Sequence, residues 1–101
     1  MSFGLIIEAD VREEIRAAGD WYEGREPGVG GRFAVALDNC LQQILSDPSR
    51  YPKIGPTTHK AKILGWPYSV FFTILNEKRL VKVIAVWQGS QDSAKLRRRL
   101  K

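Results

Sequence analysis

The chain of 101 residues has few of the side chains from which disulfides and metal sites are built. It contains one cysteine, Cys40, and one histidine, His59. A single cysteine excludes an internal disulfide, and two soft ligands without a nearby carboxylate cluster are too few for a zinc site. We therefore expect no metal and no cofactor. Cys40 is expected to be a small core residue among the apolar positions of a helix.

Long apolar runs are also missing. No stretch approaches the roughly 20 apolar residues that a membrane-spanning helix requires. The opening segment, MSFGLIIE, has no basic residue, and its apolar run is too short for a secretory signal. These absences predict a cytoplasmic protein without a membrane partner. The length predicts a single domain, 1–101, with one modest core.

The net charge of +5 conceals a sharp division of the chain. Residues 1–47 hold four basic and nine acidic residues, a net of −5, whereas residues 48–101 hold twelve basic and two acidic residues, a net of +10. Such asymmetry indicates a polyanion or an acidic protein as the partner of the basic part. The simpler alternative is a solvated basic surface that serves solubility.

Two amphipathic helices are predicted in the acidic part. The apolar stripe of the first is made of Val11, Ile15, Ala18 and Tyr22. Their spacings of four, three and four residues predict a helix from about residue 11 to residue 24 or 25. Asp10, with Glu13 three residues later, fits a capping box at its start.

A break and a second helix follow. The segment 26–31, EPGVGG, is too rich in proline and glycine to continue a helix, so the second helix is expected to begin near Arg32 and to end at 47–48. Its apolar stripe is made of Phe33, Leu37, Cys40 or Leu41, and Ile44. Two helices joined by a short turn predict an antiparallel hairpin.

Four segments have the composition of β-strands: 3–8, 60–64, 68–75 and 80–87. Turns are expected at 65–67 and 76–79. The last two strands are apolar on both faces, so they should lie centrally, covered on one side by the hairpin. The sequence thus predicts a two-layer α+β fold of order β-α-α-β-β-β, in which a three-stranded antiparallel sheet follows the hairpin. The first strand is expected beside or across from that sheet, and a basic tail, 88–101, ends the chain.

Several short motifs occur in the same order as these elements. They are Trp21-Tyr22-Glu23, Pro27-Gly28-Val29-Gly30, Arg32-Phe33, Tyr51-Pro52, Trp66-Pro67-Tyr68 and Val83-Ile84-Ala85-Val86. Over about residues 5 to 99, this series resembles the RelE/ParE toxin superfamily, where the patterns read roughly W-Y-E, P-G-L-G, R-F and F-P-Y. The first block looks closer to the ParE-like, plasmid-stabilisation branch.

The resemblance implies a compact bacterial toxin, the stable half of a type II toxin–antitoxin pair, silenced by direct binding of a cognate acidic antitoxin. Two targets are implied: RelE-like members cut messenger RNA on the ribosome, and ParE-like members poison DNA gyrase. It also leaves open a homodimer or a toxin–antitoxin heterotetramer.

Departures from the family pattern fall where catalysis would occur. After the last strand many relatives read H-x-x-R-D-P, whereas this chain has Gln88 at the histidine, Gln91 at the arginine and Ser93 at the proline. Ahead of the W-P-Y turn, where an arginine pair is common, it has His59-Lys60. The set for metal-free RNA cleavage therefore looks incomplete, and we lean towards a protein that is not an enzyme.

The candidate site residues are mostly basic. Those expected to bind the target or another anionic partner are Lys60, Lys62, Lys82, Arg97, Arg98 and Arg99. Lys60 and Lys62 alternate on their strand and so should share a face. If the protein is a ribonuclease, His59 would assist Lys60 and Lys62; a loop-edge histidine without a role is the simpler interpretation.

Aromatic residues and the tail supply the remaining candidates. Trp66, Trp87 and Gln88 are candidates for antitoxin docking, because a tryptophan in a turn and one at a strand end could form an exposed apolar patch. Trp21, Tyr22 and Tyr68 fit core positions, as Trp66 also does. The arginines of the tail could bind phosphates, an acidic antitoxin or this chain's own acidic helices.

Three functional hypotheses follow. The first is a ParE-like toxin that acts by macromolecular binding, the second an mRNA-cleaving ribonuclease, and the third a diverged, non-toxic binding module. Bacterial expression separates them by their effects on messenger RNA, DNA and growth.

Overall fold

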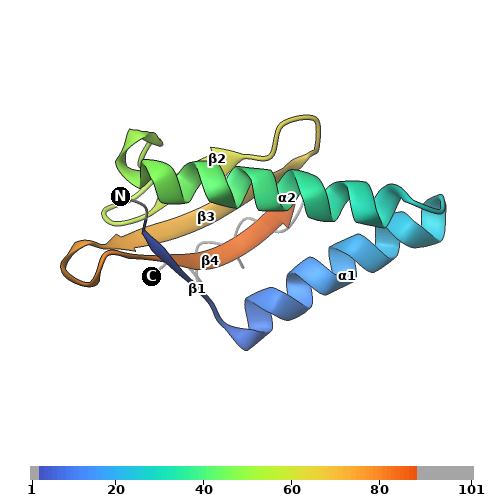
Figure 1. The fold of residues 1–101 in the computed structure, drawn as a ribbon, viewed down its shortest axis with the longest axis horizontal. Helices are drawn as coiled ribbons and strands as arrows, with labels where there is room; N and C mark the ends of the chain where they lie inside the picture. The colour runs from blue at the N-terminus through green and yellow to red at the C-terminus, as the bar shows by residue number, and fades with distance from the viewer. Residues whose placement is uncertain (1–2, 89–101) are drawn as a thin grey trace.

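The computed structural model describes residues 3–88 and has the predicted order of elements (Figure 1). Its helices and strands are β1 Gly4–Ile7, α1 Ala9–Arg25, α2 Val29–Ser46, β2 His59–Lys62, β3 Tyr68–Leu75 and β4 Leu80–Gln88. Two short 3₁₀ turns, Pro48–Arg50 and Asn76–Lys78, lie in the connections. Within this part of the chain α1 and α2 are the only α-helices, and neither has an apolar stretch that would reach across a bilayer.

The strands form one four-stranded sheet in the order β1-β4-β3-β2. The expected antiparallel set is confirmed, because β3 is antiparallel to both β2 and β4. The first strand joins it as a fourth member, parallel to β4, with Gly4 opposite Leu80 and Ile7 opposite Val83. The sheet is therefore mixed. Two parallel neighbouring strands need a long connection, and the connection from β1 to β4 starts with the helical hairpin.

The apolar stripes form the core between the hairpin and one face of the sheet. Residues from both helices and from β2, β3 and β4 are buried there together. Its largest fully buried side chains are Phe33, Phe72, Ile44, Ile63, Val70, Val81 and Val83. Cys40, 8% exposed, belongs to the same core, as its helical position predicted. Figure 1 shows α2 running over the sheet and α1 turning back beside it.

A β-bulge in β4 places a second apolar cluster on the other face of the sheet. Phe71 pairs with Ala85 and Phe72 with Val83, so Ile84 is an extra residue in β4. Because side chains alternate between faces, one extra residue reverses the alternation beyond it. Ala85 and Trp87 consequently lie with Phe71 in a cluster separate from the main core. We call the face that they share, which points away from the helices, the far face.

The start of α1 differs from the predicted capping box. The helix begins at Ala9, and Glu8 is the N-cap without a side-chain hydrogen bond. Asp10 lies inside the helix, where its Oδ1 accepts a hydrogen bond only from the backbone N–H of Val11 at 2.9 Å. The prediction was wrong because the helix starts earlier than the first apolar residue of its stripe. An acidic residue in the first turn still complements the positive end of the helix dipole.

The turn between the helices is shorter than predicted, because α2 begins at Val29 rather than near Arg32. Gly28 has a φ of 92°, a conformation that glycine adopts without strain. Gly30 lies inside α2 at the contact with α1, where an added Cβ would stand 2.6 Å from the backbone oxygen of Gly19. Two glycines of the motif are therefore required by geometry: one by the turn and one by the close approach of the helices.

Candidate functional site

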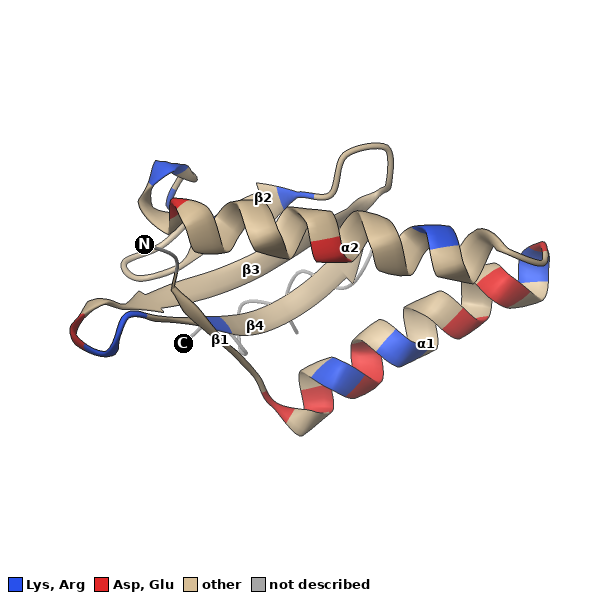
Figure 2. Cartoon of the chain, in the orientation of Figure 1, with Lys and Arg blue, Asp and Glu red and all other residues tan. Residues whose placement is uncertain are grey.

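The candidate anion-binding residues Lys60 and Lys62 lie on the far face of the sheet. In β2 the buried residues alternate with the two exposed lysines. Lys60 lies opposite Phe71 and Lys62 opposite Ser69. The prediction that the two lysines share a face is confirmed. Figure 2 shows basic colouring on β2 and acidic residues interspersed with basic ones along α1.

Each of the two lysines is held by a neighbouring group. The Nζ of Lys60 lies 5.9 Å from the centroid of the Phe71 ring, within range of a cation–π contact. The Nζ of Lys62 donates a hydrogen bond of 2.9 Å to the backbone oxygen of Trp66. Both side chains are exposed, so this basic strip can attract an anionic partner. We call Lys60 and Lys62 the lysine pair.

Lys82 points to the same face but has an acidic partner in the chain. Its Nζ lies 2.7 Å from Oε1 of Glu8, and both side chains are about half exposed. This pairing balances the charge of Lys82 locally. Its assignment to an anionic partner stays a prediction, with a competing carboxylate already in place.

His59 is buried rather than at a loop edge. It is 6% exposed, and its Nδ1 lies 2.8 Å from the backbone oxygen of Tyr51. The ring stacks on Phe72 with centroids 5.3 Å apart and an angle of 14° between planes. Because His59 precedes Lys60 on β2, it faces the core while the lysine pair faces away. The structure does not bring His59 to the lysine pair.

Two further expectations concern the arginines of the tail and metal binding. Arg97, Arg98 and Arg99 lie outside the described residues. Within residues 3–88, no three histidine, cysteine, aspartate or glutamate side chains come together in a way that would hold a metal ion.

Trp66 and Trp87 do not form the expected exposed patch. Trp87 is 7% exposed, next to Gln88 at the end of β4. Trp66 is half-buried, with its ring centroid 4.8 Å from that of Tyr22 and 5.2 Å from that of Phe33. Trp21, by contrast, was expected in the core and is 57% exposed. The exposed aromatic surface thus lies on α1 rather than at Trp66 and Trp87.

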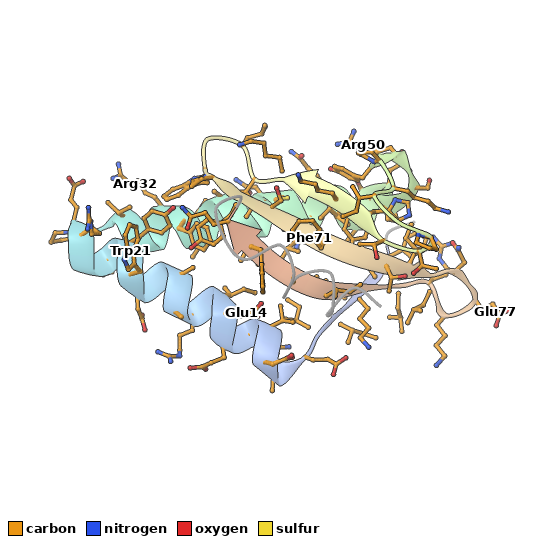
Figure 3. All side chains as sticks on the ribbon, turned by 180° about the vertical axis from the view of Figure 1, so that it is seen from behind. Glu14, Trp21, Arg32, Arg50, Phe71 and Glu77 are labelled. Atoms are coloured by element: carbon orange, nitrogen blue, oxygen red, sulfur yellow. The ribbon has the colours of Figure 1, made fainter. Side chains whose placement is uncertain are left out.

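A hollow that the sequence did not predict lies between α1 and the ends of β3 and β4. It has a volume of about 300 Å³ and is lined by Glu14, Ala17, Ala18, Trp21, Tyr68, Val86 and Gln88. We call it the α1 hollow; Glu14 and Trp21 are labelled in Figure 3. Burial, and secondarily the nearby Tyr22, raises the pKa of Tyr68, so its hydroxyl stays neutral at physiological pH. The signal that could have found the hollow is the spacing of residues 14, 17, 18 and 21, which share one helix face.

Comparison with known proteins agrees with this architecture. No family model matches the chain. The RelE1 toxin of Caulobacter vibrioides is 23% identical over 95 residues, which cover 91% of this chain and 99% of that protein.

Solved structures extend the likeness in fold. A chain of the chromosomal ParDE toxin–antitoxin system of P. aeruginosa has a TM-score of 0.74 at 12% identity, over 86% of this chain and 96% of that one. A mutant of the E. coli RelE toxin in the free state has a TM-score of 0.66 at 19% identity, over 95% of this chain and 93% of that one. A chain of the E. coli RelBE toxin–antitoxin complex has a TM-score of 0.66 at 19% identity, over 89% of this chain and 100% of that one. Together with the β-α-α-β-β-β order, these similarities show that the chain shares the fold of the matched RelE and ParDE structures.

Proposed function

We propose that this chain is the toxin of a type II toxin–antitoxin system and that it acts by binding a macromolecule, as ParE-like members do. The observation that carries this proposal is the superfamily's fold over nearly the whole chain, with an exposed lysine pair on the far face. DNA gyrase is the proposed target class. Residues Lys60 and Lys62 are proposed to contact it or another anionic partner.

The position of His59 favours binding over RNA cleavage. Metal-free cleavage needs a group that takes the 2′-hydroxyl proton, a group that protonates the leaving oxygen, and cations at the phosphate. The lysine pair supplies cations, but the one imidazole of the chain is stacked on Phe72 in the core. Gln88, at the position of a family histidine, cannot transfer protons.

An mRNA-cleaving activity is the second candidate, and the likeness to a toxin named RelE1 supports it. In that case one residue of the lysine pair would have to transfer the proton as well as contact the phosphate. Lys60 and Lys62 are then the proposed catalytic residues. A diverged, non-toxic binding module is the third possibility.

We propose a cognate acidic antitoxin as the partner. The solved neighbours include the RelBE and ParDE toxin–antitoxin systems, which supports this assignment. The chain offers the lysine pair as a basic surface. The half-buried Trp66 and Gln88 stay proposed docking candidates, whereas Trp87, at 7% exposed, offers little surface to a partner. A toxin–antitoxin heterotetramer or a homodimer is the proposed assembly.

Induced expression in bacteria tests the proposal. Growth arrest with double-strand DNA breaks and an SOS response, and with intact messenger RNA, is the expected result. Messenger cleavage before growth stops would replace the first hypothesis with the second. Normal growth at full expression of folded protein would leave only the non-toxic module. If a small acidic protein is encoded next to this chain, rescue of growth by its co-expression would support the antitoxin assignment.

A further inference from the structure

The α1 hollow combines three kinds of group around a single small volume. Trp21 and Tyr68 contribute aromatic rings, Glu14 a half-buried carboxylate, and Gln88 a side-chain amide. Ala17, Ala18 and Val86 contribute small apolar surface, which leaves the space open. Trp21 is one of the largest apolar side chains left exposed in the described part of the chain, at 57%.

This set of groups matches the chemistry of a guanidinium. A planar cation stacks on aromatic faces and donates paired hydrogen bonds to a carboxylate. The aromatic wall here already attracts such a group, because the guanidinium carbon of Arg25 lies 4.9 Å from the Trp21 ring centroid. Arg25 is not among the residues that line the hollow, whereas Trp21 and Glu14 both are. A second guanidinium that enters the hollow would therefore meet both the Trp21 ring and the Glu14 carboxylate.

The chain itself carries arginines within reach. Gln88, the last described residue, lines the hollow, so the tail leaves from its edge. Arg97 follows nine residues later, a distance of at most roughly 30 Å for an extended chain. Residues 89–101 include five basic residues and one acidic residue, whereas α1 carries Asp10, Glu13, Glu14, Asp20 and Glu23. The opposite charges favour contact between the two segments.

We propose that the α1 hollow is a guanidinium-binding site for the chain's own Arg97–Arg99 run. The Glu14 carboxylate accepts the hydrogen bonds of the guanidinium, and Trp21 and Tyr68 contact its faces. This inference does not rest on the proposed toxin function. Its consequence is that the arginine held by the hollow is withdrawn from phosphate or antitoxin binding, which leaves the lysine pair as the principal cationic surface.

Trypsin cleavage of the full-length protein tests this proposal directly. Trypsin binds the arginine side chain at the cleaved bond, so an arginine held in the hollow is protected. The rates of cleavage after Arg97, Arg98 and Arg99 are followed by mass spectrometry and compared with those of a synthetic peptide of residues 89–101. At least one of these bonds should be cleaved on the order of tenfold more slowly in the protein, the size of one charge-assisted hydrogen bond.

Two variants locate the protection. Glu14→Gln and Trp21→Ala should each raise the cleavage rate of that bond towards the peptide's rate. Glu13→Gln is the matched control, because Glu13 is the neighbouring carboxylate on α1 and pairs with Arg16 on the exposed side. Cleavage after Lys82, in the central strand β4, reports unfolding and should stay slow in every variant.

Two results would overturn the proposal. Cleavage of the wild-type tail at the peptide's rate would show that the hollow does not hold it, even if an arginine-rich peptide added from outside binds there. Protection that survives both Glu14→Gln and Trp21→Ala would place the arginines elsewhere.

Discussion

The carboxylate of Glu23 near the end of α1 accepts a hydrogen bond of 3.0 Å from the backbone N–H of Gly30 in α2. The same carboxylate accepts hydrogen bonds from the N–H of Gly28 at 3.1 and 3.0 Å. The first N–H groups of a helix lack partners within the helix, and an anion satisfies both these donors and the positive end of the helix dipole. Glu23 therefore joins the two helices, and this explains why W-Y-E and P-G-x-G occur together.

Replacing Glu23 tests this role. Glu23→Ala should lower the free energy of unfolding by about 1 kcal/mol, the usual effect of losing an N-cap. Urea denaturation of the two proteins measures the difference. The control is Glu26→Ala, because Glu26 makes only an exposed ion pair of 3.3 Å with Arg32. Equal losses in both variants would contradict the capping role of Glu23.

Two neighbouring glycines provide a matched test of the helix contact. A Cβ at Gly30 would lie 2.6 Å from the oxygen of Gly19 and 3.0 Å from Cβ of Glu23, whereas a Cβ at Gly31 meets nothing within 4 Å. Gly30→Ala should therefore destabilise the protein by roughly 1–3 kcal/mol through overpacking. Gly31→Ala should be neutral or stabilising by up to about 1 kcal/mol, because alanine favours the helix. Urea denaturation of both variants that gave the same sign would show that the helices do not meet at Gly30.

The buried faces of the helices could be predicted, because burial follows the helical spacing of the apolar residues. Val11, Ala18, Phe33 and Ile44 were expected on apolar stripes, and all are buried. Helix ends were less predictable, because residues 29–31 have poor helix propensity and yet belong to α2. The Glu23 carboxylate and the packing against α1 stabilise this first turn, and neither contact is visible from local composition.

The direction of the side chains at the end of β4 depends on one bulge residue, which the alternation of side chains along a strand could not identify. Ile84 is the bulge, and without it Trp87 would point to the same side as Val83. The pairing of β1 with β4 joins residues about 75 positions apart, so its parallel sense required the three-dimensional structure. His59 was misplaced for a related reason: its burial depends on contacts with Phe72 in the neighbouring strand and with the Tyr51 carbonyl, which local composition does not reveal.

Cys40 gives a prediction about reactivity and pH. Burial raises the pKa of its thiol above the ordinary value, so the thiolate is scarce in the folded protein. Modification by Ellman's reagent at pH 8 should be at least about tenfold slower than in urea-unfolded protein, because it requires opening of the core. Equally rapid modification in both states would place the thiol at the surface.

The same shift sets the sign of a pH effect on stability. When the pH rises past the ordinary thiol pKa, the unfolded chain loses the Cys40 proton before the folded chain does. The unfolded state is then favoured, and the free energy of unfolding falls with increasing pH. In Cys40→Ala this fall should be smaller between pH 8 and pH 10 in urea titrations. An unchanged slope would show that Cys40 does not contribute.

The pairing of Lys82 with Glu8 predicts a weak coupling. Both side chains are about half exposed, so a double-mutant cycle with Lys82→Ala and Glu8→Ala should give no more than about 1 kcal/mol in urea denaturation at low salt. Addition of 0.5 M sodium chloride should reduce it further by screening. A coupling of several kcal/mol would mean that the pair organises β1 and β4 to a degree that its exposure does not predict.

The most direct measurement is the growth of bacteria that express the charge-reversed double variant Lys60→Glu/Lys62→Glu. If the lysine pair meets the target, this variant should lose growth arrest while it remains folded by circular dichroism. Lys78→Glu, an exposed lysine in the turn between β3 and β4, is the control and should arrest growth as the wild type does. Undiminished arrest by the double variant would contradict the account, because the far face would then not be the surface that acts on the cell.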